Sequence, residues 1–209
     1  MGKLIFKYGV MGSGKSLHLL ATAHNFEMHN IPFLVFKSEI DTRDGENVIH
    51  SRALNERPCI TISIYDNIYK ILIKYFESLF YTGYDKPKWI LVDEAQFLTR
   101  NQVEELAAIV DNFEINVICY GLRTDFRSNL FEGSKRLFEL ADSFEEIKSS
   151  CNCNCKALIN ARIDGNGDIV TNGEQIEVGG DDRYNSICRK CFFQKTNHLL
   201  YNNKENNLD

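Results

Sequence analysis

A glycine-rich motif near the start of the chain restricts its fold more than any other feature. Residues 9–16 read Gly-Val-Met-Gly-Ser-Gly-Lys-Ser, which fits the P-loop pattern G-x-x-x-x-G-K-[ST]. An apolar run at 4–6 precedes the motif, and a helical apolar spacing follows it at Leu17, Leu20, Ala21 and His24. This order of strand, glycine loop and helix predicts an α/β fold with a phosphate site at a helix N-terminus.

Each residue type in the motif suits phosphate binding. Glycines let backbone N–H groups approach phosphate oxygens, Lys15 can reach the β- and γ-phosphates, and Ser16 can bind Mg²⁺. We therefore assign the whole loop to phosphate binding: Gly9, Val10, Met11, Gly12, Ser13, Gly14, Lys15 and Ser16.

The rest of the N-terminal part alternates strands and helices. We expect buried strands at 33–36, 60–64 and 116–120, helices at 67–80, 101–113 and 134–141, and a long polar loop at 38–57. This alternation predicts a P-loop NTPase-type parallel sheet flanked by helices.

A second motif is an apolar strand that ends in two carboxylates, Trp89-Ile-Leu-Val-Asp93-Glu94. This pattern is typical of a Walker B strand, whose carboxyl end lies near the P-loop in a parallel sheet. We expect Asp93 to hold Mg²⁺, and Glu94 stands where it could accept a proton from an acceptor hydroxyl.

Five of the seven cysteines cluster near the C-terminus. Cys188 and Cys191 form a C-x₂-C pair, and the other half of the cluster contains Cys151, Cys153 and Cys155. In a reducing compartment, four thiolates from two such halves favour a structural, tetrahedral Zn²⁺ over disulfides. The spacing leaves open which two of the first three cysteines bind.

These patterns predict the domain organisation. We expect an α/β domain at 1–147, a small zinc-binding β module at 148–195 with turns at 164–168 and 172–173, and a disordered polar tail at 196–209. The net charge of −5 over 209 residues argues against a dedicated nucleic-acid binder. Without a membrane-length apolar run or a signal peptide, a cytoplasmic protein is expected.

A P-loop and a Walker B strand define a nucleotide site but not a reaction. The string from Asp93 to Gln96 resembles a helicase motif, so a zinc-bearing P-loop ATPase acting on nucleic acid is one alternative. A nucleotide sensor without turnover is another. One domain cannot supply a two-lobed helicase motor, however, and aromatic residues near the expected ends of strands suit a planar base: Phe97, Phe126, Phe131 and Tyr184.

Six motifs together resemble the zinc-containing thymidine kinases of the cellular and bacterial type. They are 9–16, Asp41-Thr-Arg43, Asp93-Glu-Ala-Gln-Phe97, Gly121-Leu-Arg-Thr-Asp-Phe126 with Phe131, Gly179-Gly180 with Tyr184, and Cys188-x-x-Cys191. The resemblance implies transfer of the γ-phosphate of ATP to the 5′-hydroxyl of thymidine or deoxyuridine, for DNA precursor synthesis. It also implies a homotetramer inhibited by dTTP, with no nucleic-acid or membrane partner.

The resemblance further implies a role for each matching residue. Glu94 would be the general base, Ser16, Asp93 and Asp41 would serve Mg²⁺, and Arg43 and Gln96 would join the ATP site. The nucleoside pocket would be formed by Met11, Phe97, Leu122, Phe126, Phe131, Ile176, Val178, Gly179 and Tyr184. A lasso loop at about 165–186 would hydrogen-bond the edge of the base through its backbone.

The first half of the zinc motif departs from the family pattern. The family has C-x₂-C there, whereas this chain has one residue fewer between Cys151 and Cys153, which match the two family cysteines. Cys155 could replace either of them. The departure leaves the individual ligands open but not the metal.

Overall fold

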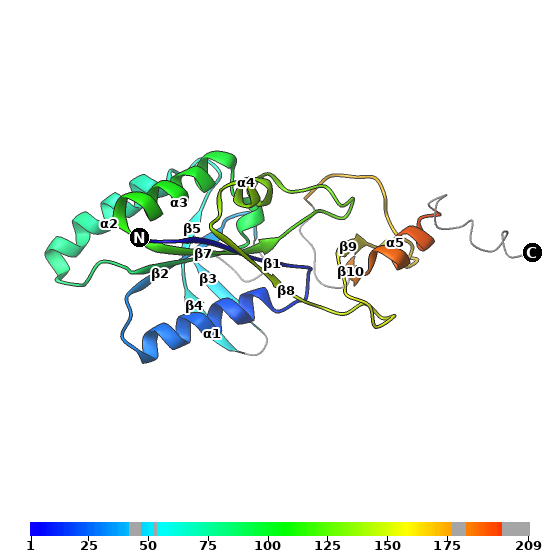
Figure 1. Cartoon of the computed structure of the whole chain (residues 1–209), viewed down its shortest axis with the longest axis horizontal. Helices are drawn as coiled ribbons and strands as arrows, with labels where there is room; N and C mark the ends of the chain where they lie inside the picture. Colours follow the sequence, from blue (N-terminus) through cyan, green and yellow to red (C-terminus); the bar gives the residue numbers. More distant parts are fainter. Residues whose placement is uncertain (42–46, 52–53, 177–182, 198–209) are drawn as a thin grey trace, which may run out of the picture.

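A six-stranded parallel sheet forms the centre of the computed structural model, which describes residues 1–41, 47–51, 54–176 and 183–197 (Figure 1). Every neighbouring pair of strands in this sheet runs parallel, as predicted. In order across the sheet the strands are β5 (Ile60–Ile62), β2 (Phe33–Ser38), β6 (Trp89–Asp93), β7 (Asn116–Leu122), β1 (Leu4–Gly9) and β8 (Ser143–Ile147).

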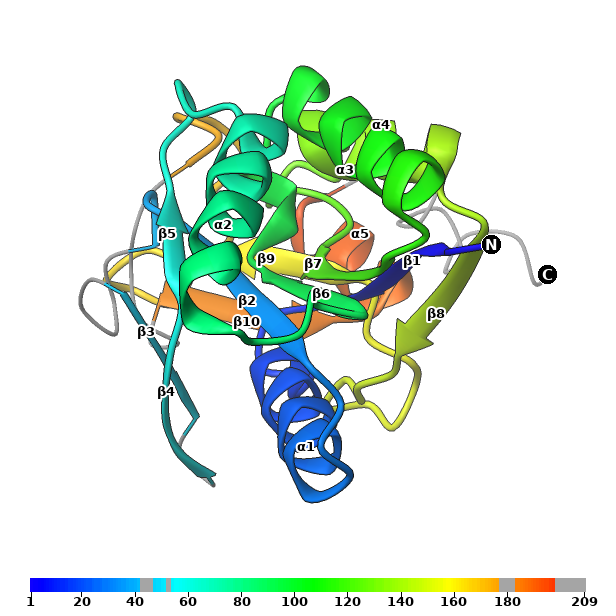
Figure 2. The same cartoon turned by 90° about the vertical axis from the view of Figure 1, so that its left-hand side faces the viewer.

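Helices cover both faces of the sheet (Figure 2). One face carries α2 (Ile68–Thr82), α3 (Arg100–Phe113) and α4 (Glu132–Leu140), and the other carries α1 (Lys15–Met28) with the antiparallel pair β3 (Val48–Ser51) and β4 (Leu54–Pro58). Because both faces are covered, the central strands contain continuous apolar runs.

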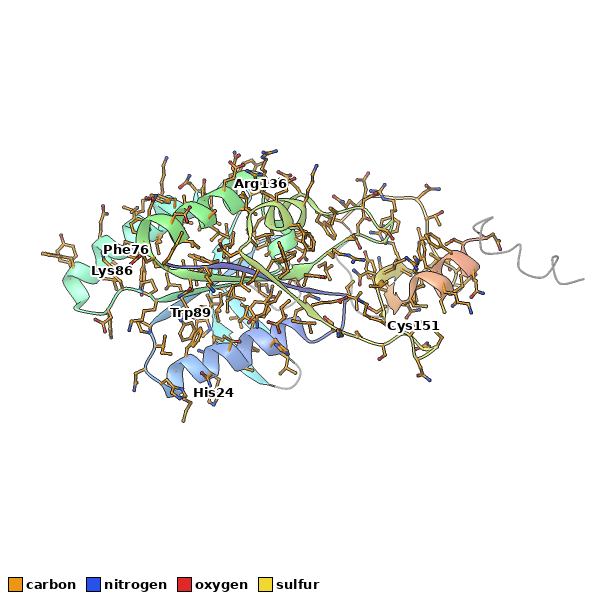
Figure 3. The ribbon with its side chains drawn as sticks, viewed as in Figure 1. His24, Phe76, Lys86, Trp89, Arg136 and Cys151 are labelled. Carbon is orange, nitrogen blue, oxygen red and sulfur yellow. The ribbon has the colours of Figure 1, made fainter. Side chains whose placement is uncertain are left out.

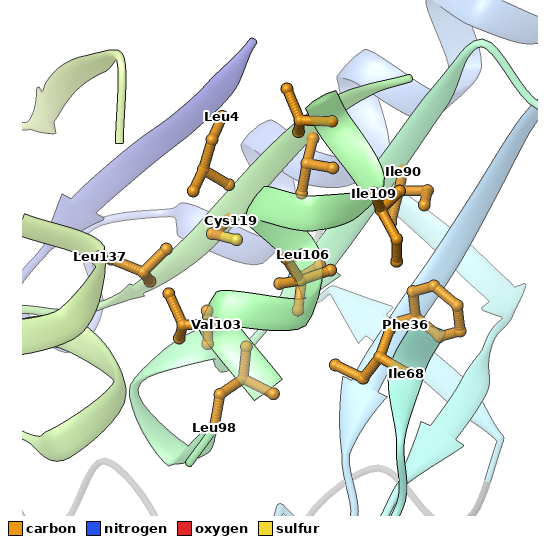
Figure 4. Packing of buried hydrophobic residues seen from close by; sticks show 14 of the residues in the cluster. Leu4, Phe36, Ile68, Ile90, Leu98, Val103, Leu106, Ile109, Cys119 and Leu137 are labelled. Atoms are coloured by element: carbon orange, nitrogen blue, oxygen red, sulfur yellow. The ribbon is translucent and has the colours of Figure 1, made fainter. Parts of the chain in front are cut away.

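Two separate apolar clusters fill these layers. On β6, Ile90 and Val92 pack toward α3, where Leu106 and Ile109 meet them (Figure 4). Leu91, between them, joins the opposite cluster beneath α1. The alternation that defines a strand is therefore present inside a run that reads as continuously apolar.

A small C-terminal module lies at the carboxyl edge of the sheet (Figure 1). It contains the antiparallel pair β9 (Ile159–Arg162) and β10 (Tyr184–Ile187), followed by α5 (Arg189–Lys195). Its apolar core is small and consists of Cys151, Ile159, Ala161, Ile187, Cys188 and Phe192. So few buried side chains contribute little stability, which is why a metal would matter here.

Two local predictions were wrong, and one strand was missed. The loop expected at 38–57 contains β3 and β4, and Ile49 is fully buried against α1. The edge strand β8 was missed because its residues are polar and Phe144 is half-exposed. The buried face of α1 is one residue out of register with the predicted face and consists of Leu19, Leu20, Ala23 and Phe26.

The turn predicted at 164–168 is confirmed, because the N–H of Asp164 donates to the carbonyl of Asp168 and Ile163 bridges to Ile169. No strand pairing flanks 172–173 in the described parts of the chain. Among the described helices, none combines the length and the apolar character needed to cross a bilayer.

Candidate active site

The P-loop connects the end of β1 to the start of α1. Gly12 and Gly14 have φ angles of 68° and 86°, in the left-handed region where a side chain is strained. The ammonium of Lys15 is buried and donates to the carbonyl of Val10 at 2.9 Å. The loop thus has the shape that a phosphate-binding nest requires.

The carboxylate of Asp93 lies at the end of β6, buried beside this loop. It accepts hydrogen bonds from the hydroxyl of Ser16 and, at 3.0 Å, from the N–H of Glu94. Burial, and next the neighbouring Glu94 carboxylate, raise the pKa of Asp93 to about 7, although Ser16 and Lys15 oppose the rise. The carboxylate of Asp93 and the hydroxyl of Ser16 are oxygen ligands, and the positive charge near them does not balance the buried carboxylates. Such a site fits a divalent cation such as Mg²⁺.

We expect Asp93→Asn to stabilise the metal-free protein at pH 8. The folded pKa lies above the unfolded value, so the stability that Asp93 contributes is present below pH ~4 and is lost as the pH rises through about 7. At pH 8 the amide removes a buried charge, worth roughly 2 kcal/mol or about 4–8 °C in Tm. Calorimetry should show this gain at pH 8 and a smaller one at pH 5.

The exposed Asp85 offers a control for this prediction. Asp85→Asn should leave Tm unchanged at both pH values, because an exposed carboxylate is already hydrated. A lower Tm for Asp93→Asn at pH 8 would contradict the expected cost of the buried charge.

Glu94 is held in a fixed position next to Asp93. Its φ of 51° is left-handed, which is uncommon for a residue with a side chain and is found at functional sites. The side-chain amide of Gln96 donates to the Glu94 carboxylate and accepts from the N–H of Leu122 at 2.9 Å. Gln96, which was expected in the ATP site, is buried between the ends of β6 and β7 and holds Glu94.

The aromatic residues singled out by the sequence form two pairs, one in direct contact and one joined through Arg162. The rings of Phe97 and Phe131 meet edge to face with centroids 5.9 Å apart. The guanidinium of Arg162 lies 3.9 Å from the centroid of the Phe126 ring and donates to the hydroxyl of Tyr184 at 3.1 Å. Arg162 thus joins an aromatic residue after β7 to one at the start of β10.

The predicted lasso is held by hydrogen bonds at Glu174 and Gln175. Arg162 donates to the carbonyl of Glu174 at 3.0 Å, and Gln175 donates to the buried carboxylate of Asp125 at 3.1 Å. The next residue, Ile176, is exposed and lines a hollow together with Arg162. Three predicted site residues lie outside the described residues: Arg43, Val178 and Gly179.

Lys37 was missed by the sequence analysis and is fully buried. It faces Asp93 in the β2–β6 register, and its ammonium lies 3.5 Å from the carboxylate of Asp41. Asp41 was expected near Mg²⁺, but it does not form a close cluster with Asp93 and Glu94 in the part of the chain that is described. The only sign of it in the sequence was a lysine directly after the apolar run at 33–36.

Four cysteine sulfurs meet at one end of the small module, where Figure 3 labels Cys151. The sulfurs of Cys151, Cys153, Cys188 and Cys191 all lie within 4.8 Å of one another, and Cys155 is not part of this group. Hydrogen bonds to the thiolate of Cys151, first from the backbone N–H of Cys153 and then from that of Cys188, outweigh burial and lower its pKa to about 6. Sulfurs around tetrahedral Zn²⁺ are roughly 3.8 Å apart, so this donor set fits zinc.

Comparison with known proteins places the chain in one family. The thymidine kinase family model matches residues 2–192. A thymidine kinase of Zymomonas mobilis is 43% identical over 203 residues, covering 95% of this chain and all of that protein. One of Mannheimia succiniciproducens is 42% identical, covering 95% and 99%, and one of Shouchella clausii is 44% identical, covering 91% and 96%.

A solved structure, the Pif1 helicase from Candida albicans, is only distantly similar. Its TM-score is 0.41 at 13% identity, covering 71% of this chain and 36% of that one, which is too low to support any conclusion. The family model and the curated relatives agree over nearly the whole length. The chain belongs to the thymidine kinase family.

Proposed function

We propose that this protein is a thymidine kinase that transfers the γ-phosphate of ATP to the 5′-hydroxyl of thymidine, and of deoxyuridine, for deoxynucleotide synthesis. The observation that carries the proposal is the fixed carboxylate of Glu94, which is next to the Asp93–Ser16 pair and is held by Gln96. The 5′-oxygen attacks the γ-phosphorus, the bond to the β–γ bridging oxygen breaks, and ADP leaves. Glu94 accepts the proton of the 5′-hydroxyl.

The chain's contribution to this reaction is positioning and charge. The P-loop amides and Lys15 hold the phosphates, as in other P-loop enzymes. Ser16 and Asp93 would hold Mg²⁺, which neutralises the charge of the transferring phosphoryl group when it is bound. Asp41, oriented by Lys37, and Arg43 would complete the donor side.

The acceptor side is formed by apolar and aromatic residues. Met11, Leu122 and the four rings would enclose the base, which suits a planar ligand. The lasso, with Ile176, Val178, Gly179 and Tyr184, would close over the nucleoside. Support for this comes from Arg162, which ties Tyr184 to Phe126.

Finer features complete the proposal. The four clustered cysteines would hold a structural Zn²⁺, with an α/β domain at 1–147, the zinc module at 148–195 and a tail at 196–209. We further propose a cytoplasmic homotetramer inhibited by dTTP.

A thin-layer assay of labelled thymidine with Mg-ATP tests the proposed function. Conversion to dTMP with an equal amount of ADP is expected. ATP hydrolysis that is stimulated by DNA or RNA, without a nucleoside product, would instead indicate an ATPase acting on nucleic acid. Tight dTTP binding without any turnover would indicate a sensor.

A further inference from the structure

The small module binds one residue of the P-loop, Met11, through both its N–H and its carbonyl. The N–H of Met11 donates to the side-chain carbonyl of Asn160 at 2.7 Å. The carbonyl of Met11 accepts from the hydroxyl of Ser186, also at 2.7 Å. Asn160 and Ser186 face each other directly in the register of β9 and β10, so one cross-strand pair makes both contacts.

This pair is firmly connected on the module side. Asn160 is buried, and its amide nitrogen also donates to the carbonyl of Thr124 after β7, at 3.2 Å. One side chain therefore joins the module, the P-loop and the end of β7. Cys188, one of the four clustered cysteines, follows Ser186 by two residues, so the contacts to Met11 lie close in sequence to the proposed metal site.

The contacts bear on phosphate binding because a P-loop acts through the direction of its backbone N–H groups. Within the loop itself, the N–H of Ser13 and the ammonium of Lys15 both donate to the carbonyl of Val10. Asn160 holds the same Val10–Met11 peptide from outside, through its N–H, and Ser186 holds the next peptide, Met11–Gly12, through its carbonyl. Rotation of either peptide would reorient the amides that follow.

We propose that Asn160 and Ser186 are positioning residues that set the conformation of the P-loop for ATP. The module thereby supports the donor site and not the acceptor pocket alone, and ATP affinity depends on its integrity. This inference rests on the ATP site of the proposed function.

The test compares variants at Ser186 in the full-length, zinc-loaded protein. Calorimetric titration with a non-hydrolysable Mg-ATP analogue should show about tenfold weaker binding for Ser186→Val, which lacks the hydroxyl, because the part-buried carbonyl of Met11 loses its donor. Ser186→Thr restores the hydroxyl and should bind within about twofold of wild type. Asn185→Val, at the exposed neighbouring position of β10, is the matched control.

Asn160→Leu is a second variant. It removes the hydrogen bond to the N–H of Met11 and should weaken binding of the analogue at least as much. Zinc content and Tm are measured for every variant, since a purely structural role would change these and not the affinity of the zinc-loaded protein. Loss of zinc from both Ser186→Val and Asn160→Leu would overturn the inference.

The remaining outcomes separate the inference from the proposed function. If the zinc-loaded variants bind the analogue as tightly as wild type does, the inference fails and the proposed function stands. If the wild type itself does not bind the analogue, both fail.

Discussion

Glu94→Gln should lower kcat for thymidine phosphorylation by about 10³-fold while the protein still binds nucleotide. Loss of a general base typically costs 10²–10⁴-fold, roughly 3–5 kcal/mol in the barrier. The substitution keeps the size of the side chain and an oxygen that can accept the hydrogen bond from Gln96. The effect therefore falls on proton acceptance and not on the fold. Single-turnover kinetics with labelled thymidine measures it directly.

The same variant has a second expected result, at Asp93. The Glu94 carboxylate raises the pKa of Asp93, so its removal should lower that pKa and make Asp93 a better cation ligand. Affinity for a Mg-ATP analogue should then stay equal or increase. Glu77→Gln, on the exposed side of α2, controls for the change of charge alone. Retention of more than about a tenth of the wild-type kcat would remove Glu94 as the base.

The fold could be predicted where strands are buried on both faces and motifs are contiguous. The strands β1, β2 and β6 each contain a continuous apolar run, at 4–6, 33–36 and 89–92, which is typical of a parallel sheet covered by helices. β8 could not be predicted in this way. It is an edge strand with polar residues, and it forms because it pairs with β1. That pairing is a long-range contact, so the local sequence does not indicate it.

The candidate site divides along similar lines. The P-loop, Asp93 and Glu94 could be predicted because their motifs consist of residues that are contiguous in the sequence. Lys37 and Arg162 were not found, because a single polar residue in a strand carries no pattern until the fold brings Asp41 or Phe126 beside it. Their roles follow from burial, since a buried cation needs a carboxylate, a carbonyl or an aromatic face.

The zinc ligands show what geometry adds to spacing. Sequence spacing left Cys151, Cys153 and Cys155 as candidates for two positions. Cys153 and Cys155 are both exposed, so burial does not distinguish them either. Only the positions of the sulfurs do, because Cys153 lies 3.5 Å from the sulfur of Cys188 and Cys155 lies outside the cluster.

Substitution of Cys188 by serine should remove zinc and unfold the small module. Structural zinc contributes about 10 kcal/mol or more in small zinc-binding folds, and the module's apolar core is too small to replace it. Cys188 also caps α5 by accepting the N–H of Cys191, but serine is a good N-cap, so loss of the cap is not the cause of the effect. Elemental analysis should show zinc falling from one per chain to near zero, and thymidine phosphorylation should be lost.

The adjacent cysteines give this prediction its sharpest control. Cys153→Ser should lose zinc as Cys188→Ser does, whereas Cys155→Ser should keep one zinc per chain, wild-type Tm and wild-type activity. The two positions are equally exposed and two residues apart, so general damage to the turn would affect both alike. If Cys155→Ser lost the metal and Cys153→Ser retained it, the ligand set would contain Cys155. Because Ser186 on β10 precedes Cys188 by two residues, the zinc-depleted variants should also bind a Mg-ATP analogue weakly, which connects metal loss to the donor site.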